Sequence, residues 1–438
     1  MSDENTARHA ECTVEFDGVD ITSSIKPYLL SLTFTDNEED ASDDLQIKLQ
    51  DREGVWMTDW LQKMLDGDVS AASSDGYKVG DVVQFLGGPH YKASTDKKAN
   101  GTPKAGPAKI PIIKQGALHP YHVIHTDGTS RVYGWVDASE ISGKSGGSSS
   151  GSSEGGLKIR ATITACNWHS DGKDEALDCG EFELDSINAS GPPDIITIKA
   201  TGLPYTSQIR QTKQSKGWEK YKLSGIANEM AKKNGMKSQF LAKKDPEYKR
   251  VEQYRCSDID FLSQLCHDAG LSLKCTDGKL VIFDQKEYEG KDSAWTVTKD
   301  DKSYIKWSHT LGQAGTQYAS CRVSYVGPNG KPIEGIAYVK DYDAKSKTNQ
   351  QLEVYAPVTS KTEAKELAAK KLRLHNKFER QVGFTYHGDP GKVAGLTFET
   401  KSFGPWDGKY IVKQAKHTVT GSGGYTTQVS GRHVLGGY

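Results

Sequence analysis

Three absences narrow the functional classes open to this chain. No apolar run approaches the roughly 18 residues that a membrane-spanning helix needs. The formal net charge is -1 at pH 7, so no overall positive field favours nucleic acid or an anionic membrane as the main partner. The polar start MSDENTARHAE differs from a secretory signal, and we therefore expect the chain to be made and folded in a cytoplasm.

Cysteine is sparse and widely spaced. No CxxC pair occurs, which excludes the usual zinc ribbon and the thioredoxin-like redox motif. An odd count without close pairs favours buried free thiols in a reducing compartment. The seven cysteines are Cys12, Cys166, Cys179, Cys256, Cys266, Cys275 and Cys321.

Common catalytic and nucleotide-binding motifs are also missing: the sequence has no GxSxG, HExxH, P-loop or GxGxxG motif in its usual context. Asp178-Cys179-Gly180 has a superficial likeness to the nucleophile region of cell-wall cysteine peptidases. A nucleophilic cysteine needs a lowered pKa, usually at a helix N-terminus near a histidine. The residues after Cys179 alternate as a strand instead, so we predict no catalytic, cofactor-binding or metal-binding residues and no enzyme activity.

One acidic run could form either a calcium-binding loop or the carboxylate pair of a glycosidase. An EF-hand loop requires a glycine at its sixth position, where this run has Ala41. Nothing in one polar loop indicates a raised carboxyl pKa or a fixed carboxylate separation, as a glycosidase pair requires. We expect a solvated loop or an assembly surface. The acids are Asp36, Glu38, Glu39, Asp40, Asp43 and Asp44.

What the sequence does contain is the pattern of a turn-rich β protein. It has 45 glycines and 35% hydrophobic residues. Apolar residues alternate with polar ones in residues 14–16, 30–34 and 45–49, which predicts strands with one buried face. Asp17-Gly18 indicates a two-residue hairpin turn. The length predicts about two to four domains.

Helical spacing occurs once early in the chain, between Trp56 and Trp60, and is extended only in the second half. Apolar residues at helical spacing predict a helix over 223–231, followed by Asn234-Gly235. A second helix is expected from the N-cap Ser257 to the residues before Gly270. Ser360 and Glu363 form the capping box of a third. The first two helices, with a hairpin near residues 277–278, predict a small α+β unit between β regions.

Two Ser/Gly-rich stretches, residues 66–76 and 143–156, surround a short β-like unit. Such tethers on both sides suggest a domain inserted into a loop of another. Three histidines lie close together in this unit, but Pro120 and the β-branched neighbours predict an extended segment. Alternate residues of a strand face opposite ways, so we expect structural or surface roles for His119, His122 and His125 rather than a metal site.

Several segments together resemble the phage late control protein D family. They are DGVDIT, PYLLSLTFTDN, DDLQIKL, QDREGVW, LDCGEFELDSI, SGPPDIITIKA, IRQTKQSKGWEKYKLSGIANEMAKKNG, DIDFLSQLCHDAGLSLKCTDGKLVIFD and GKYIVKQAKHTVTGSGGYTTQVSG. The resemblance spans about residues 12–65 and 157–435. It implies a baseplate hub of a contractile phage tail or tail-like bacteriocin, with two related β-barrel domains per subunit and three subunits forming a pseudo-sixfold ring. The partners implied are the tail tube, central spike, baseplate wedge and tape measure proteins.

The inserted unit resembles bacterial SH3-like domains through KVGDVVQF and VYGWVDASEI, and HPYHVIH matches a variant attached to phage lysins. That resemblance implies a β-barrel that binds cell wall, with Tyr91, Tyr121 and Tyr133 as stacking surfaces. A decorative or protein-binding module is the equal alternative.

The expected fold is therefore mainly β, with two hub-type β-barrels, an α+β connecting unit and an inserted SH3-like β-barrel. The expected domains are residues 1–66 with 157–203 (first barrel), 77–141 (insert), 142–156 (Gly/Ser linker), 204–300 (connecting domain) and 301–438 (second barrel with one helix). The expected location is the baseplate of a particle assembled in a bacterial host cytoplasm. The alternatives are a cell-wall-targeted peptidoglycan hydrolase and a cell-wall-binding adhesin.

Overall fold

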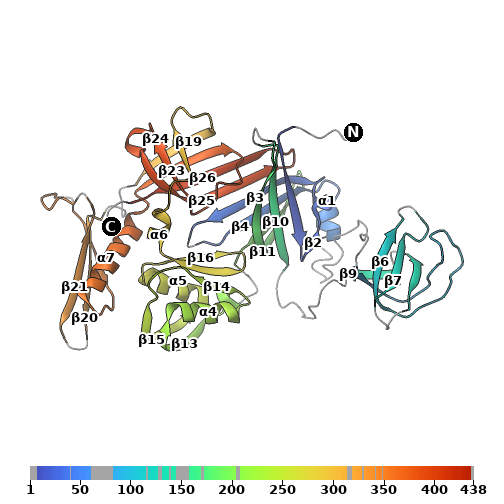
Figure 1. Ribbon diagram of the computed structural model, residues 1–438, viewed down its shortest axis with the longest axis horizontal. Helices are drawn as coiled ribbons and strands as arrows, with labels where there is room; N and C mark the ends of the chain where they lie inside the picture. Colours follow the sequence, from blue (N-terminus) through green and yellow to red (C-terminus); the bar gives the residue numbers. More distant parts are fainter. Residues whose placement is uncertain are drawn as a thin grey trace. The chain divides into compact units, whose positions relative to one another are not determined.

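The structure is a computed structural model (Figure 1). It describes residues 7–39, 41–60, 82–114, 117–126, 131–137, 140–144, 157–168, 172–203, 208–312, 318–327, 330–340, 342–347 and 349–435. The chain divides into two compact units: unit 1 contains residues 1–53 and 154–438, and unit 2 contains residues 54–153. Most of both expected Ser/Gly-rich tethers lies outside the described residues.

Unit 1 is built on a large sheet. Its strand order in the described residues is β19-β23-β26-β25-β3-β4-β12-β11-β10-β1-β2, with β24 pairing to β25 and β18 pairing to β24. The strands are β1 (His9–Phe16), β2 (Val19–Asp20), β3 (Leu29–Asn37), β4 (Asp44–Gln50), β10 (Lys158–Cys166), β11 (Glu175–Ser190), β12 (Ile195–Thr201), β18 (Trp295–Thr298), β19 (Tyr304–Leu311), β23 (Arg380–His387), β24 (Thr397–Lys401), β25 (Gly408–Thr420) and β26 (Tyr425–His433). The mainly β fold predicted from the sequence is confirmed.

The sheet joins chain segments that are far apart in sequence. Strands before unit 2 pair with strands after it, β1 with β10 and β4 with β12. The blue β3 and the red β25 lie side by side in Figure 1 and pair from Ser31–Thr420 to Asn37–Gln414. The expected closed barrels do not appear among the described strands, because the pairing path stays open from β19 to β2. β25 pairs with β3 from the N-terminal part of the chain, so the C-terminal strands do not close into a barrel of their own.

Local sequence signals explain how these strands begin and turn. Asp17 and Gly18 have φ values of 47° and 77°, the left-handed backbone that the predicted β1–β2 hairpin turn requires. Leu32 and Phe34 are buried, as alternation predicts. Leu30 was expected to share their buried face but is 40% exposed, because the β3–β4 register shifts by one residue at this end. The short helix α1 (Thr22–Ile25) follows β2.

The α+β unit has an apolar core between its helices and strands. Ser257 caps α5 by accepting a hydrogen bond from the Asp260 N–H at 3.2 Å, as predicted. Buried Met230, Leu262 and Leu280 belong to the shared core. The elements are α3 (Gln208–Gln211), β13 (Gln214–Lys222), α4 (Leu223–Lys233), β14 (Lys237–Phe240), β15 (Glu247–Cys256), α5 (Asp258–Asp268), β16 (Ser272–Thr276), β17 (Lys279–Phe283) and α6 (Gln285–Glu289). β18 follows and pairs with β24 of the large sheet.

The C-terminal third also contains a separate three-stranded sheet, which packs against the helix α7 (Lys361–Asn376). Its strands are β20 (Ser320–Val326), β21 (Pro332–Tyr338) and β22 (Gln351–Tyr355), in the order β21-β20-β22. Ser360 caps α7 as predicted, accepting from the Glu363 N–H at 3.2 Å. The short η4 (Gly404–Trp406) lies between β24 and β25.

Unit 2 is a five-stranded antiparallel sheet with its own apolar core. The order is β8-β7-β6-β5-β9, with strands β5 (Val82–Phe85), β6 (Gly106–Ile113), β7 (Tyr121–His125), β8 (Tyr133–Val136) and β9 (Ile141–Lys144). Val83, Phe85 and Ile110 are fully buried. The last residues of β9 lie in the range expected to be linker. A short helical segment, η1 (Val55–Trp60), belongs to the same unit.

Candidate functional site

The acidic run is buried, and the expectation of a solvated loop was wrong for most of it. Asp36, Glu38 and Asp43 are 7%, 3% and 2% exposed. β3 extends to Asn37 and β4 begins at Asp44, so the connection is short and lies inside unit 1. Asp44 is exposed, and Asp40 lies outside the described residues. Carboxylates this deep in a protein need cationic or hydrogen-bonding partners.

The central partner is Arg432 of β26, whose side chain has no exposed surface. Its Nε and Nη2 donate to the two carboxylate oxygens of Glu38 at 2.9 and 2.6 Å. Its Nη1 donates to Oε1 of Glu289, in α6, at 2.5 Å. A planar guanidinium with this many charge-assisted bonds fixes the orientation of both acids.

Two lysines complete the arrangement. Glu39 pairs with Lys377, just after α7, and accepts a hydrogen bond from Ser272 Oγ at 2.5 Å. Burial opposes ionisation of Glu39, but the charge and hydrogen bond of Lys377 bring the pKa of Glu39 below its usual value. Lys274 Nζ lies 2.5 Å from Asp36 Oδ1 and 3.6 Å from Asp43 Oδ1.

The pKa of Asp43 is also shifted by its buried position. Burial raises its pKa to about 6, against the pull of Lys274. The Asn37 N–H donates to Asp43 Oδ1 at 2.8 Å. Asp36 accepts from the Ala394 N–H at 2.8 Å through its other oxygen. Backbone donors as well as cations therefore hold the run in place.

We call Asp36, Glu38, Glu39, Asp43, Lys274, Glu289, Lys377 and Arg432 the charge junction. It links the β3–β4 connection to the α+β unit, the end of α7 and β26. Each of its carboxylates has a cation within 4.0 Å in the described structure. Its ion pairs connect segments that are far apart in the sequence.

Sequence reasoning missed the basic partners of this junction. Arg432 lies 394 positions from Glu38, and Lys377 lies 338 positions from Glu39. No local pattern distinguishes Lys377 from the basic residues of α7, or marks Arg432 as the partner of an acid so far away in the sequence.

Cys179 lies within β11, as the alternation predicted, and is 5% exposed. Burial, with a smaller contribution from Asp178, raises the pKa of its thiol well above the ordinary value. The thiol therefore stays protonated at neutral pH, which is the opposite of what a nucleophilic cysteine needs.

The three histidines of unit 2 do not converge. His119 precedes β7 and is 5% exposed; its Nδ1 lies 2.8 Å from Asp137 Oδ1 and its Nε2 lies 2.9 Å from Asp96 O. Its ring stacks on Tyr91 at 3.5 Å. His122 instead packs edge-on against Tyr133 and Trp135, with centroids 5.4 and 5.3 Å away.

Of the three tyrosines expected to form stacking surfaces, Tyr133 is the open one, at 62% exposure. Tyr91 lies against His119, and Tyr121 packs partly buried against the core of unit 2. Register pairs Ile112 with His122 and His122 with Trp135, so these side chains share one face with Tyr133. We call Ile112, His122, Tyr133 and Trp135 the aromatic face.

A second exposed apolar surface lies on β19 of unit 1. In the described sheet β19 is an end strand, pairing with β23 alone. Ile305, Trp307 and Leu311 are 53%, 43% and 49% exposed. Trp307 and Leu311 are four positions apart in regular register and share one face, whereas the β19–β23 register shifts by one residue at Ile305. Exposed apolar side chains on an edge strand are typical of an assembly surface, because the unpaired edge can also accept a further strand.

None of the helices in the described part of the chain combines the length and apolarity needed to cross a membrane.

No protein-family model and no curated protein matches this sequence. Solved structures do match. The tail protein from Neisseria meningitidis MC58 has a TM-score of 0.57 and 8% identity, over 97% of this chain and 97% of that chain. The prophage MuSo2 43 kDa tail protein from Shewanella oneidensis has a TM-score of 0.52 and 12% identity, also over 97% of each chain. At such low identity, what the chain shares with these tail proteins is the fold.

Proposed function

We propose that this chain is the baseplate hub protein of a contractile phage tail or a tail-like bacteriocin. Three copies form a ring that joins the tail tube to the central spike. The observation that carries the proposal is the shared fold, which extends over 97% of this chain and 97% of each of two tail proteins. The resemblance of the sequence to late control protein D supports the same role.

In this proposal, residues 1–66 with 157–203 and residues 301–438 are the two related halves of the subunit, and residues 204–300 connect them. Pairing of β3 with β25 and the charge junction hold these parts in one rigid orientation. A ring of three such subunits presents six similar halves to the tail tube and a threefold axis to the spike. Heterologous contacts between different surfaces produce a closed ring when the rotation closes.

The role is structural, and the protein acts in the baseplate of a particle assembled in the bacterial host cytoplasm. Its partners are copies of itself and the tube, spike, wedge and tape measure proteins. The paired carboxylates of the charge junction and the protonated thiol of Cys179 support a non-enzymatic role.

The test of the ring is the assembly state of the full chain, measured by light scattering and by electron microscopy of isolated tail particles. We expect three subunits. A chain that is monomeric even within the particles would overturn the proposal.

A pair of variants tests whether β19 contributes to the ring. Trp307→Lys puts a charge on the exposed apolar edge and should shift the trimer toward monomer. Tyr254→Lys is the matched control, because Tyr254 is 69% exposed on β15 of the α+β unit. Equal effects of the two substitutions on the trimer would show that β19 is not part of the interface.

For unit 2 we propose contact with the cell wall or with other baseplate proteins through the aromatic face. Rings such as Tyr133 and Trp135 provide stacking area for sugars. The test is sedimentation of the full chain with purified cell walls, compared with Tyr133→Ala and with the variant Tyr254→Ala in unit 1. Retention of the full chain that Tyr133→Ala weakens supports the wall ligand; no retention leaves other baseplate proteins as the partner.

The rival functions are a peptidoglycan hydrolase and a wall-binding adhesin. A zymogram on cell walls separates the first from the hub, because a cleared band from the purified protein would establish hydrolysis. An adhesin binds walls but forms no ring, so wall sedimentation by a monomeric chain identifies the second.

A further inference from the structure

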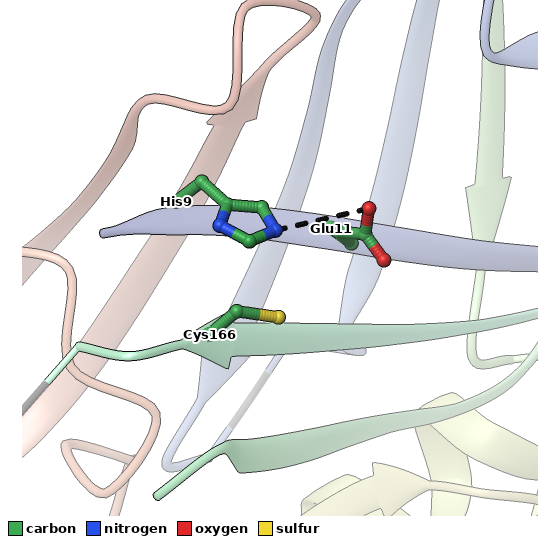
Figure 2. A group of neighbouring side chains, drawn as sticks. All are labelled: His9, Glu11 and Cys166. Carbon is green, nitrogen blue, oxygen red and sulfur yellow. Dashed lines mark ion pairs between the residues drawn. The ribbon is translucent and has the colours of Figure 1, made fainter. Parts of the chain in front are cut away.

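Three side chains of different ligand chemistry meet on the first strand pair of the large sheet. His9 and Glu11 are two residues apart on β1 and therefore point to the same side. The β1–β10 register places Cys166 directly opposite His9. Figure 2 shows the imidazole directed toward the Glu11 carboxylate, with Cys166 on the neighbouring strand. One ligand atom from each residue lies within 4.8 Å of the other two, and His9 Nε2 is 3.9 Å from Glu11 Oε1.

The imidazole is oriented by its second nitrogen. His9 Nδ1 lies 2.8 Å from the Ala7 carbonyl oxygen. A carbonyl oxygen only accepts, so Nδ1 donates its proton to it, and Nε2 is the nitrogen directed toward Glu11, 3.9 Å from Oε1. Donation of the other ring N–H to a backbone carbonyl is the usual arrangement of a metal-binding histidine.

We propose that His9, Glu11 and Cys166 bind one Zn²⁺ ion. Imidazole nitrogen, carboxylate oxygen and thiolate sulfur are the three donor types that zinc takes in proteins, at about 2.0–2.2 Å to nitrogen or oxygen and about 2.3 Å to sulfur. In a tetrahedron these bonds put neighbouring ligand atoms roughly 3.3–3.7 Å apart. The observed separations reach this range with side-chain movements of about 1 Å or less.

The charges and the solvent exposure of the three ligands suit a bound divalent ion. A neutral imidazole, a carboxylate and a thiolate carry a total charge that balances the ion, and the thiol proton passes to solvent on binding. Lys26 Nζ now lies 3.2 Å from the same Glu11 oxygen, but its side chain is 72% exposed and can turn into solvent. Because half of the Glu11 side chain is exposed, water reaches the ion and completes four-coordination.

The ion would join the start of β1 to the last residue of β10. His9 and Glu11 precede unit 2 in the sequence and Cys166 follows it, so the metal clips the N-terminal strand to the first strand after that unit. The same end of β1 meets the β25–β26 turn, where the Ala10 N–H donates to the Gly423 carbonyl at 2.9 Å. Metal binding to the folded state therefore stabilises the junction of three distant segments.

The experiment uses the metal-free full chain, titrated with Co²⁺ as a spectroscopic probe and with Zn²⁺ by calorimetry. We expect one ion per chain and a thiolate-to-cobalt charge-transfer band. Cys166→Ala should abolish the band and weaken Zn²⁺ binding by more than about 100-fold, beyond what loss of a supporting outer group costs. His9→Gln and Glu11→Gln should each weaken it by more than about 10-fold.

Cys12→Ser and Glu15→Gln are the matched controls, because both residues lie on β1 outside the trio. Both should bind like the unaltered chain. A missing thiolate band in the unaltered chain, or Zn²⁺ binding that Cys166→Ala leaves unchanged, would overturn the proposal. If circular dichroism shows that Cys166→Ala is unfolded, the variants at His9 and Glu11 decide, since the side chains they change are 27% and 50% exposed.

Discussion

Unit 2 and unit 1 differ in how far along the sequence their interiors are assembled. The hydrophobic cluster of unit 2 comes from residues 83–141, and its buried His119 bonds Asp137 only 18 positions away. In unit 1, fully buried Arg432 binds Glu38 from 394 positions away, and β25 pairs with β3 across almost the whole chain. Apolar contacts form between any suitable neighbours, whereas a buried ion pair requires its one partner. Unit 2 therefore depends on its own segment, and unit 1 depends on the return of distant strands.

The substitution with the largest expected effect is Arg432→Met. It leaves Glu38 and Glu289 buried without their cation, which should lower the free energy of unfolding of unit 1 by about 3–5 kcal/mol. Denaturant unfolding measures the change. Arg160→Met is the control, because Arg160 pairs with Asp178 on the exposed face of β10 and should cost less than about 1 kcal/mol. Equal losses would mean that the charge junction contributes no more than a surface pair.

Ile110→Ala addresses the other side of the comparison. Ile110 has no exposed surface, and its truncation should destabilise unit 2 by about 2–5 kcal/mol. In scanning calorimetry we expect the transition of unit 2 to move while that of unit 1 stays in place. Ile112→Ala, on the same strand at 50% exposure, should have little effect. Simultaneous destabilisation of both units by Ile110→Ala would contradict their independence.

The third test measures how the stability of unit 1 depends on pH through buried His417 of β25. Burial lowers the pKa of His417 to about 4, whereas an unfolded histidine titrates near 6.5. Between these values the unfolded chain binds a proton that the folded chain does not. Lowering the pH from 7 to 5 therefore removes roughly 2 kcal/mol of stability through this group.

Asp43 acts in the opposite direction over the same range. Its folded pKa of about 6 exceeds the unfolded value, so the folded chain gains a proton first and stability rises as the pH falls. Between pH 7 and pH 5, the free energy of unfolding should therefore fall by roughly 2 kcal/mol less in His417→Gln than in the unaltered chain. His125→Gln, on the exposed end of β7, is the control. An unchanged pH profile in His417→Gln would show that this histidine is not the titrating group.

The smallest effect is expected where structure is set by neighbouring residues alone. Ser360→Ala removes the side chain that accepts the Glu363 N–H at the start of α7 and should cost about 1 kcal/mol. Thr362→Ala, exposed in the first turn, should stay within about 0.5 kcal/mol. Thermal unfolding of the two variants checks the difference, and indistinguishable midpoints would refute the capping role.

Prediction from the sequence succeeded where the signal was local. The Asp17-Gly18 turn, the Ser257 and Ser360 caps and the strand at Cys179 all follow from a few adjacent residues. The prediction for the acidic run failed because the same composition is found both in solvated loops and in one half of a buried ion-pair cluster. The proposed zinc ligands could not be predicted from the sequence, since Cys166 joins His9 and Glu11 only through the β1–β10 register.

By itself the sequence determined a mainly β chain, the positions of its turns and helix caps, and the extended conformation around Cys179, because backbone preferences and alternation act over short distances. Only the tertiary structure decided that β3 and β25 share a ladder, that Glu38 and Arg432 are buried together, and that unit 1 continues on both sides of unit 2. Contacts between segments hundreds of residues apart depend on the path of the whole chain, which no local pattern encodes.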